Sequence, residues 1–360
     1  MIGGSALLLT HTTLLFLGDL NRLKDWKIMN KSYNWVPIFG EFDVKDDTVV
    51  FHGKLVNAPP AGHASTSTDA PAPPNQLPAL GEIVSDQYLA TGTVSAEVTF
   101  EKVGSRTACA IVLGYDVDRG AFIKAGFTRE DFAAFSIQEW QPGTPDSREP
   151  AKQPQWVPLS FSGDRSFIKS GQAYRLRTSV FGSHVALEIN GVSVASANLR
   201  TPILMPRPVG LWCSSHSKVT VSNYLVAAEQ PRAFVVMHFA KPFDEVYADV
   251  IKETCHSFGL ETVRADEIYG PGLIIQDIVQ QILRSQIVIA EITPENANVY
   301  FEVGYALAWN KPIVLLARHG TQLPFDVSGF RVLLYEDSIG GKAKLQKGLQ
   351  LHLQAILGRT

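Results

Sequence analysis

Residues 290–317, AEITPENANVYFEVGYALAWNKPIVLLA, decide the fold of the C-terminal half of the chain. The stretch opens on the end of an apolar strand, continues through a helical segment, NVYFEVGYALAWN, and closes on a second apolar strand, PIVLLA. Strands that are apolar throughout are buried on both faces, and a helix between two of them indicates a parallel sheet with right-handed crossovers. One residue breaks the pattern, because Glu302 stands among apolar neighbours near the start of the helix.

The same alternation of strand and helix extends over residues 233–360. Apolar strands are predicted at AFVVMHF, LETVRA, IVIAEI, PIVLLA and RVLLY. Helical patterns separate them, including an amphipathic helix at PFDEVYADVIKETCHSFG, and a terminal helix follows the last strand. We therefore predict a C-terminal α/β domain over residues 233–360, with a five-stranded parallel sheet in the flavodoxin-like order 2-1-3-4-5.

The N-terminal half has a different period. Between residues 33 and 227 apolar and polar residues alternate, as in GTVSAEVTF and VALEINGVSVA, and Asn190-Gly191 is a strong hairpin signal. We predict an all-β antiparallel sandwich of the jelly-roll type over residues 33–227. Residues 57–81, rich in Pro, Ala, Ser and Thr, are expected to form a flexible surface insertion, residues 141–155 a shorter exposed loop, and residues 228–232 a linker.

Composition restricts the class of protein. The chain has 360 residues, 45% of them hydrophobic, and a formal net charge of -3, which favours a soluble two-domain protein and gives no basic patch for nucleic acid. Three scattered cysteines predict a reducing, cytoplasmic location. The apolar run ALLLTHTTLLFLG is too short to span a membrane, so residues 1–32 are expected to form a packed segment, with secretion as the alternative.

In the order 2-1-3-4-5, ligands bind at the carboxyl ends of strands 1 and 3, where the chain reverses direction across the sheet. The helix that carries Glu302 starts at this crevice, which gives a physical reason for a carboxylate among apolar neighbours. Glu302 is therefore predicted to face the ligand site. The loops at the same edge of the sheet supply the predicted substrate-binding residues, which are His238, Phe239, Lys241, Arg264, Asp266, Tyr269, Glu291, Asn296 and Asn298.

These residues also have structural interpretations. Glu302 is alternatively a helix-start glutamate that the helix dipole stabilises, and Arg264 with Asp266 is alternatively a surface ion pair. Asn298 is a candidate N-cap, and His238 a packed strand-end histidine. The tryptophans of the sandwich, Trp140, Trp156 and Trp212, are expected to serve packing, and no metal-ligand cluster is predicted.

Four motifs carry a family resemblance. FVVMHFAKPFDEVY, VRADEIYGPG, IVIAEIT and NANVYFEVGYALAWNKPIVLL resemble the nucleoside 2-deoxyribosyltransferase-like family, which is close in fold to the TIR-type NAD hydrolases. The resemblance implies that Glu302 is a nucleophile on the anomeric carbon. Asn296 and Asn298 stand where the transferases tend to have an acidic residue, and His238 where many relatives have proline, which argues against deoxyribosyl transfer.

The sandwich is similar to concanavalin and laminin-G-like jelly rolls in NWVPIFGEFDVKDDTVVFHGK and PVGLWCSSHSKVTVSNYLV. Together the resemblances imply an N-glycosidase that cleaves the base from NAD or a related nucleotide, needs no cofactor, and acts as a regulated effector of the antiviral defence type. A homo-oligomer and a small-molecule or protein activator at the sandwich are the expected partners. The alternatives are a nucleoside 2-deoxyribosyltransferase, a nucleoside-monophosphate hydrolase, or a non-catalytic nucleotide-sensing module.

Overall fold

The structure is a computed structural model that describes residues 33–57, 76–143, 153–267 and 274–358. The predicted packed segment over residues 1–32 and the site candidate Tyr269 lie outside the described residues, as do most of the predicted insertion over 57–81 and of the predicted loop over 141–155. In the part of the chain that is described, none of the helices combines the length and the apolar composition that a membrane crossing requires.

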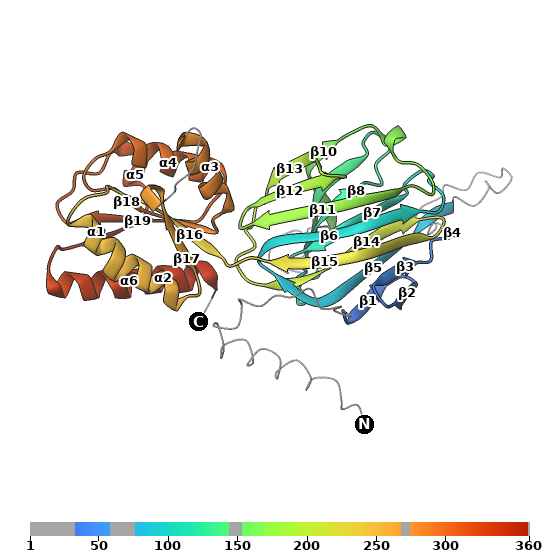
Figure 1. Cartoon of the computed structure of the whole chain (residues 1–360), viewed down its shortest axis with the longest axis horizontal. Coiled ribbons are helices and arrows are strands. Elements are labelled where there is room, and N and C mark those ends of the chain that lie inside the picture. Colours follow the sequence, from blue (N-terminus) through green and yellow to red (C-terminus); the bar gives the residue numbers. More distant parts are fainter. Residues whose placement is uncertain (1–32, 58–75, 144–152, 268–273, 359–360) are drawn as a thin grey trace, which may run out of the picture. The chain divides into compact units, whose positions relative to one another are not determined.

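Fifteen strands of the described N-terminal half form two antiparallel sheets, as the period-two pattern predicts (Figure 1). They are β1 (Trp35–Phe39), β2 (Phe42–Lys45), β3 (Thr48–Phe51), β4 (Leu55–Asn57), β5 (Gln76–Leu89), β6 (Thr91–Phe100), β7 (Ala108–Leu113), β8 (Phe122–Phe127), β9 (Phe135–Gln141), β10 (Gln155–Ser162), β11 (Ala173–Phe181), β12 (His184–Ile189), β13 (Val192–Asn198), β14 (Arg207–Ser215) and β15 (Val219–Ala228). The first sheet has the order β1-β5-β14-β7-β8-β9-β10, with β4 also paired to β5. The second has the order β13-β12-β11-β6-β15-β3-β2.

The hairpin prediction is confirmed, and two loop boundaries are wrong. Asn190 and Gly191 join β12 to β13 with φ values of 52° and 81°. The predicted insertion over 57–81 is too long, because Asn57 ends β4 and residues 76–81 belong to β5, which pairs with β4. The predicted loop over 141–155 likewise includes its two flanking strand residues. Composition marks such segments but not their ends, which depend on pairing with a neighbouring strand.

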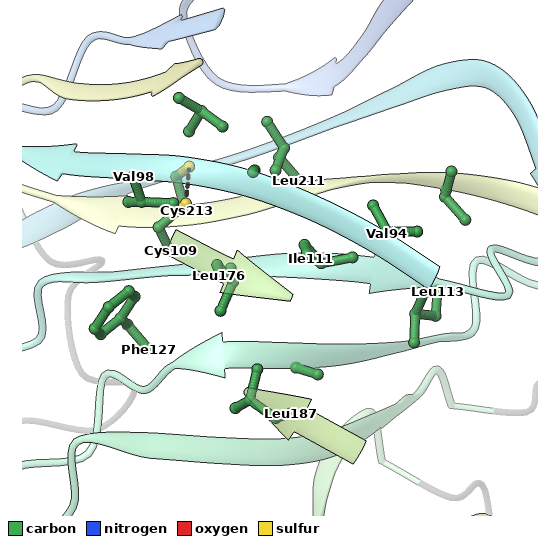
Figure 2. Close-up of a cluster of buried hydrophobic side chains, with 14 of the residues drawn as sticks. Val94, Val98, Cys109, Ile111, Leu113, Phe127, Leu176, Leu187, Leu211 and Cys213 are labelled. Atoms are coloured by element: carbon green, nitrogen blue, oxygen red, sulfur yellow. Dashed lines mark hydrogen bonds between the residues drawn. The ribbon is translucent and has the colours of Figure 1, made fainter. Parts of the chain in front are cut away.

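The core of the sandwich lies between the two sheets. Val94 of the second sheet packs with Ile111 and Leu211 of the first (Figure 2). Cys109 and Cys213 face each other on β7 and β14, with their Sγ atoms 3.7 Å apart, and both are buried free thiols. The apolar residues that alternate along each strand therefore point to the same side, and together they fill the layer between the two sheets.

Leu211→Ala is expected to lower the free energy of unfolding of the sandwich by roughly 2–5 kcal/mol, because it removes a fully buried side chain and leaves a cavity. Leu225→Ala is the matched control, since Leu225 is 52% exposed on β15. Chemical denaturation of the two variants measures the difference. Equal losses would contradict this position of the core.

The C-terminal half is an α/β domain with one parallel sheet (Figure 1). Its strands are β16 (Arg232–Val236), β17 (Glu261–Arg264), β18 (Ile287–Glu291), β19 (Ile313–Arg318) and β20 (Val332–Tyr335), and its helices are α1 (Phe243–Val246), α2 (Glu253–Ser257), α3 (Ile274–Arg284), α4 (Ala297–Ala308), α5 (Phe325–Ser328) and α6 (Ile339–Leu357). A π-helical stretch joins α1 to α2 over Tyr247–Lys252, so the helix predicted there is present. The strand order β17-β16-β18-β19-β20 is the predicted order 2-1-3-4-5.

Helices cover both faces of this sheet. On one face Val235, Ile289 and Leu316 pack with α1, α2 and α6, and on the other Val236 and Ala290 pack with α3 and α4. The central strands are thus buried on both sides, which explains their uninterrupted apolar sequence. The linker is shorter than predicted, because β15 ends at Ala228 and β16 begins at Arg232.

The turn that follows α4 is hydrogen-bonded to the sandwich, and residues 33–360 form one compact unit. Lys311 is 3% exposed, and its Nζ donates to the carbonyl oxygen of Phe181 on β11 at 2.8 Å. The same Nζ donates to the carbonyl oxygens of Leu283 at 2.6 Å and Ser285 at 2.8 Å, beside the end of α3. The side chain of Asn310 donates to two further sandwich carbonyls, at 3.1 and 3.0 Å. Hydrogen bonds to the sandwich therefore hold the carboxyl-terminal end of α4.

Candidate functional site

The start of α4 is capped by Asn296. Its side chain accepts a hydrogen bond from the backbone N–H of Asn298 at 3.0 Å, and its backbone is extended, as N-cap residues require. The interpretation of Asn298 as the N-cap is therefore wrong. Asn298 is an exposed residue of the first turn, and the asparagine two positions earlier satisfies its backbone N–H.

Glu302 lies in the second turn of α4, on the stripe that faces the sheet. Val299, Val303 and Ala306 share this stripe and belong to the core between α4 and the sheet. Glu302 is 7% exposed, and its carboxyl oxygens are not among the fully buried atoms that lack a hydrogen-bond partner in the described residues. Burial raises its pKa to about 7. Its position is thus that of a buried carboxyl group, whereas a glutamate stabilised by the helix dipole at the surface would be solvated.

A second buried carboxyl group, that of Glu291, ends the central strand β18. Glu291 is 1% exposed, and its Oε2 accepts a hydrogen bond from the backbone N–H of Thr293 at 3.1 Å. The hydroxyl of Tyr335, at the end of β20, donates to its Oε1 at 3.3 Å. Burial raises the pKa of Glu291 to about 7, because it outweighs these hydrogen bonds and the nearby positive charge of Arg318.

Sequence reasoning missed Arg318 and Tyr335. Arg318 ends β19, forms an ion pair with Asp337, and has its guanidinium carbon 5.1 Å from the centre of the Phe243 ring. Both residues directly follow the apolar cores of their strands, and this position, the carboxyl end of a parallel strand, is the signal that would have found them.

At the other side of the switch point, Arg264 is held by two carboxylates. Its Nε is 2.6 Å from Asp266, its Nη1 is 2.8 Å from Asp244, and its side chain is only 11% exposed. The guanidinium carbon lies 4.4 Å from the centre of the Tyr247 ring and 5.4 Å from that of Phe239. The structure therefore shows Arg264 and Asp266 as an ion pair, with the aromatic ring of Phe239, 47% exposed, beside it.

The remaining predicted residues are at the rim. His238 is exposed, with its ring 5.9 Å from that of Phe243, and Lys241 is exposed and pairs with Glu245 at 3.5 Å. Phe243 contacts both His238 and Arg318, so it links the ends of β16 and β19. No direct contact joins Glu302 to these groups among the described residues.

The chemistry that this edge of the sheet offers is that of carboxyl groups. Glu291 and Glu302 are both buried, and a pKa near 7 lets a carboxyl group act in either protonation state at neutral pH. Within the described ranges, no three His, Cys, Asp or Glu side chains are grouped so that they could hold a metal ion.

Glu302→Gln is expected to raise the melting temperature at pH 8 by roughly 5 °C relative to the wild type. The folded-state pKa of Glu302 lies above its usual value of 4.5, so its contribution to stability is present below pH 4.5 and is lost as the pH rises through about 7. Glutamine does not ionise, and the difference between variant and wild type should grow from pH 5 to pH 8 in thermal melts. The exposed Glu295→Gln is the control, and a difference independent of pH would contradict the burial of Glu302.

Comparison with known proteins gives likenesses of structure alone. No protein-family model matches the chain, and no curated protein matches its sequence. Similar solved structures include the carbohydrate-binding module CBM66 from Bacillus subtilis, with a TM-score of 0.37, 12% identity, and coverage of 53% of this chain and 92% of that chain. A functionally unknown protein from Saccharomyces cerevisiae has a TM-score of 0.33, 14% identity, and coverage of 55% and 96%. A β-1,3-1,4-glucanase (lichenase) derived from a mouse hindgut metagenome has a TM-score of 0.31, 11% identity, and coverage of 53% and 90%. Likenesses at these TM-scores carry no conclusion about activity.

Proposed function

We propose that the α/β domain is an N-glycosidase that cleaves the bond between base and ribose in NAD or a related nucleotide, with Glu302 as the catalytic carboxylate. The observation that carries the proposal is the position of Glu302, which is 7% exposed on a helix that starts at the switch point of the sheet. Burial raises the pKa of this carboxyl group to about 7, and a carboxyl group with a shifted pKa at the ligand edge of a sheet is a candidate functional group.

The chemistry of base release fits such a group. The bond between the anomeric carbon and the base nitrogen breaks through a transition state with oxocarbenium character, and a carboxylate stabilises its positive charge or forms a covalent ester with the anomeric carbon. In NAD the nicotinamide leaves as a neutral base and needs no proton. Water then supplies the hydroxyl group on the anomeric carbon of the product, which is ADP-ribose when NAD is the substrate, and releases one proton.

The surrounding fold supports the same assignment. The strand order 2-1-3-4-5 is that of flavodoxin-like domains, in which ligands bind at the edge where Glu291, Arg264 and Phe239 are found. We assign these residues to substrate contacts, with the Phe239 ring as a stacking surface for a base. The nucleotide is then a substrate rather than a cofactor. We assign the jelly-roll-like sandwich to sensing or to assembly, and we expect the protein to act as a homo-oligomer in the cytoplasm.

Glu302→Gln is expected to lower the rate of base release at least 100-fold, because glutamine can neither neutralise the oxocarbenium charge nor form the ester. The assay follows base release from NAD, NADP and nucleoside monophosphates, with the full chain at low and high concentration. Glu295→Gln, an exposed change seven residues earlier, is the matched control and should retain the wild-type rate. Equal activity of the two variants would exclude Glu302, and exchange of one added base for another would identify a transferase instead.

The rate should also rise with pH. A carboxylate that acts as nucleophile must be ionised, and with a pKa of about 7 in the free protein its ionised fraction, and hence kcat/KM, increases about tenfold from pH 6 to the plateau above pH 8. The measurement is kcat/KM between pH 5 and 9 at substrate concentrations well below KM. A rate that falls across this range would mean that the protonated acid is the active form, contrary to the proposed role.

A further inference from the structure

The outward face of the first sheet of the sandwich carries buried polar and aromatic side chains. Successive residues of a strand point to opposite faces, so Trp212 faces outward between the core residues Leu211 and Cys213, and Lys124 faces outward on β8. We call this surface the aromatic face, and it includes Glu82, Tyr115, Phe122, Lys124, Gln138, Trp140, Trp156, Trp212 and Ser214. These residues come from β5, β14, β8, β9 and β10, and Tyr115 follows the end of β7, the strand that lies between β14 and β8.

Lys124 is the central charged group of the aromatic face. It is 1% exposed, and its Nζ lies 3.9 Å from the centre of the Trp156 ring and 3.7 Å from that of Trp212. Its Nζ has no hydrogen-bond partner among the described residues. Two indole rings attract an ammonium group, but they leave its N–H donors without an acceptor.

Two neighbouring polar groups are also incompletely satisfied. Glu82 is 3% exposed and sits beside Trp212 in the strand register, and its Oε1 has no partner in the described part of the chain. The hydroxyl of Ser214, two residues after Trp212 on the same face, is buried and without a partner there too. Buried polar atoms are nearly always hydrogen-bonded in folded proteins, so the grouping of these three atoms around two indole rings favours a polar ligand at this face.

We infer that the aromatic face is a ligand site for a ring compound that carries a carboxylate or phosphate group, with the ammonium of Lys124 bound to the anion and the indoles of Trp156 and Trp212 against the ring. An anion supplies the acceptors that the Lys124 N–H donors lack, and a charge-assisted bond is the stronger for being shielded from water. Trp156 is only half-buried, and in the proposed complex its indole lies against the ring of the ligand instead of against the ammonium of Lys124. Glu82 and Ser214 then meet hydroxyl groups of the ligand.

Two sources provide this chemistry, an acidic sugar and a nucleotide, and both contain a ring that stacks on indole. The face is distinct from the Glu302 crevice, because its residues lie on the sandwich strands and Glu302 lies on α4. The inference therefore does not depend on the proposed N-glycosidase activity, and either can fail without the other.

Intrinsic tryptophan fluorescence of the full chain tests the site, because three of its six tryptophans lie on the aromatic face. The titrants are sodium glucuronate, adenosine monophosphate, inorganic phosphate and, as the neutral ring, glucose. We expect a saturable change with glucuronate or with adenosine monophosphate, and a response at least tenfold weaker with glucose. Saturation by glucuronate alone assigns the site to acidic sugars, and saturation by adenosine monophosphate alone assigns it to nucleotides.

Lys124→Met separates this site from any other. It removes the charge, keeps the length of the side chain, and should weaken the binding of the effective titrant at least tenfold, while Lys124→Arg retains it. The matched control is Lys218→Met, because Lys218 is an exposed lysine just before β15 and lies outside the aromatic face. The inference is overturned if the folded wild type shows no saturable response, if phosphate alone binds as tightly as the ring compounds, or if the response survives unchanged in Lys124→Met.

Discussion

The central strands of the parallel sheet are buried on both faces, and this constraint positions the candidate site. Because β16, β18 and β19 have no solvated side, helices must cover both faces of the sheet. The helix α4 covers one of these faces, and it packs there through an apolar stripe. Glu302 occupies a position of that stripe, between Val299 and Ala306. Its carboxyl group is therefore desolvated by the fold itself, and the raised pKa is the direct consequence.

Periodicity made the larger features predictable. The change from alternating to continuously apolar strands separates the sandwich from the α/β domain, and right-handed crossovers with a switch point give the strand order that is observed. Glu302 was predicted to face the ligand crevice at the start of its helix, and the structure places it, 7% exposed, in the second turn of α4 beside Val299 and Val303. The turn at Asn190 and Gly191 was predictable because both positions need positive φ.

Contacts between strands were not predictable, because they depend on register and on side-chain reach. The bond from Tyr335 to Glu291 crosses from β20 to β18, and nothing local in either segment indicates it. Asn296 and Asn298 are chemically identical candidates for the N-cap, and the sequence alone does not show at which of the two the helix begins. Lys124 was not singled out, since the period-two pattern gives the face of its strand but not the strands that lie beside it, and the tryptophans around it were assigned to packing alone.

The two buried lysines show how the same cost is met in different ways. Lys311 and Lys124 are 3% and 1% exposed, and burial lowers the pKa of each to about 7. Lys311 donates to three carbonyl oxygens, one from β11 and two from residues at the end of α3. Its N–H donors are therefore satisfied, and the residue has a structural role. Those bonds fix the carboxyl-terminal end of α4 against the sandwich, and because a helix is a stiff rod they also restrict the position of Glu302 along it. Lys124 lies against two indole rings and has no hydrogen-bond acceptor among the described residues, which is the arrangement on which the proposed ligand site rests.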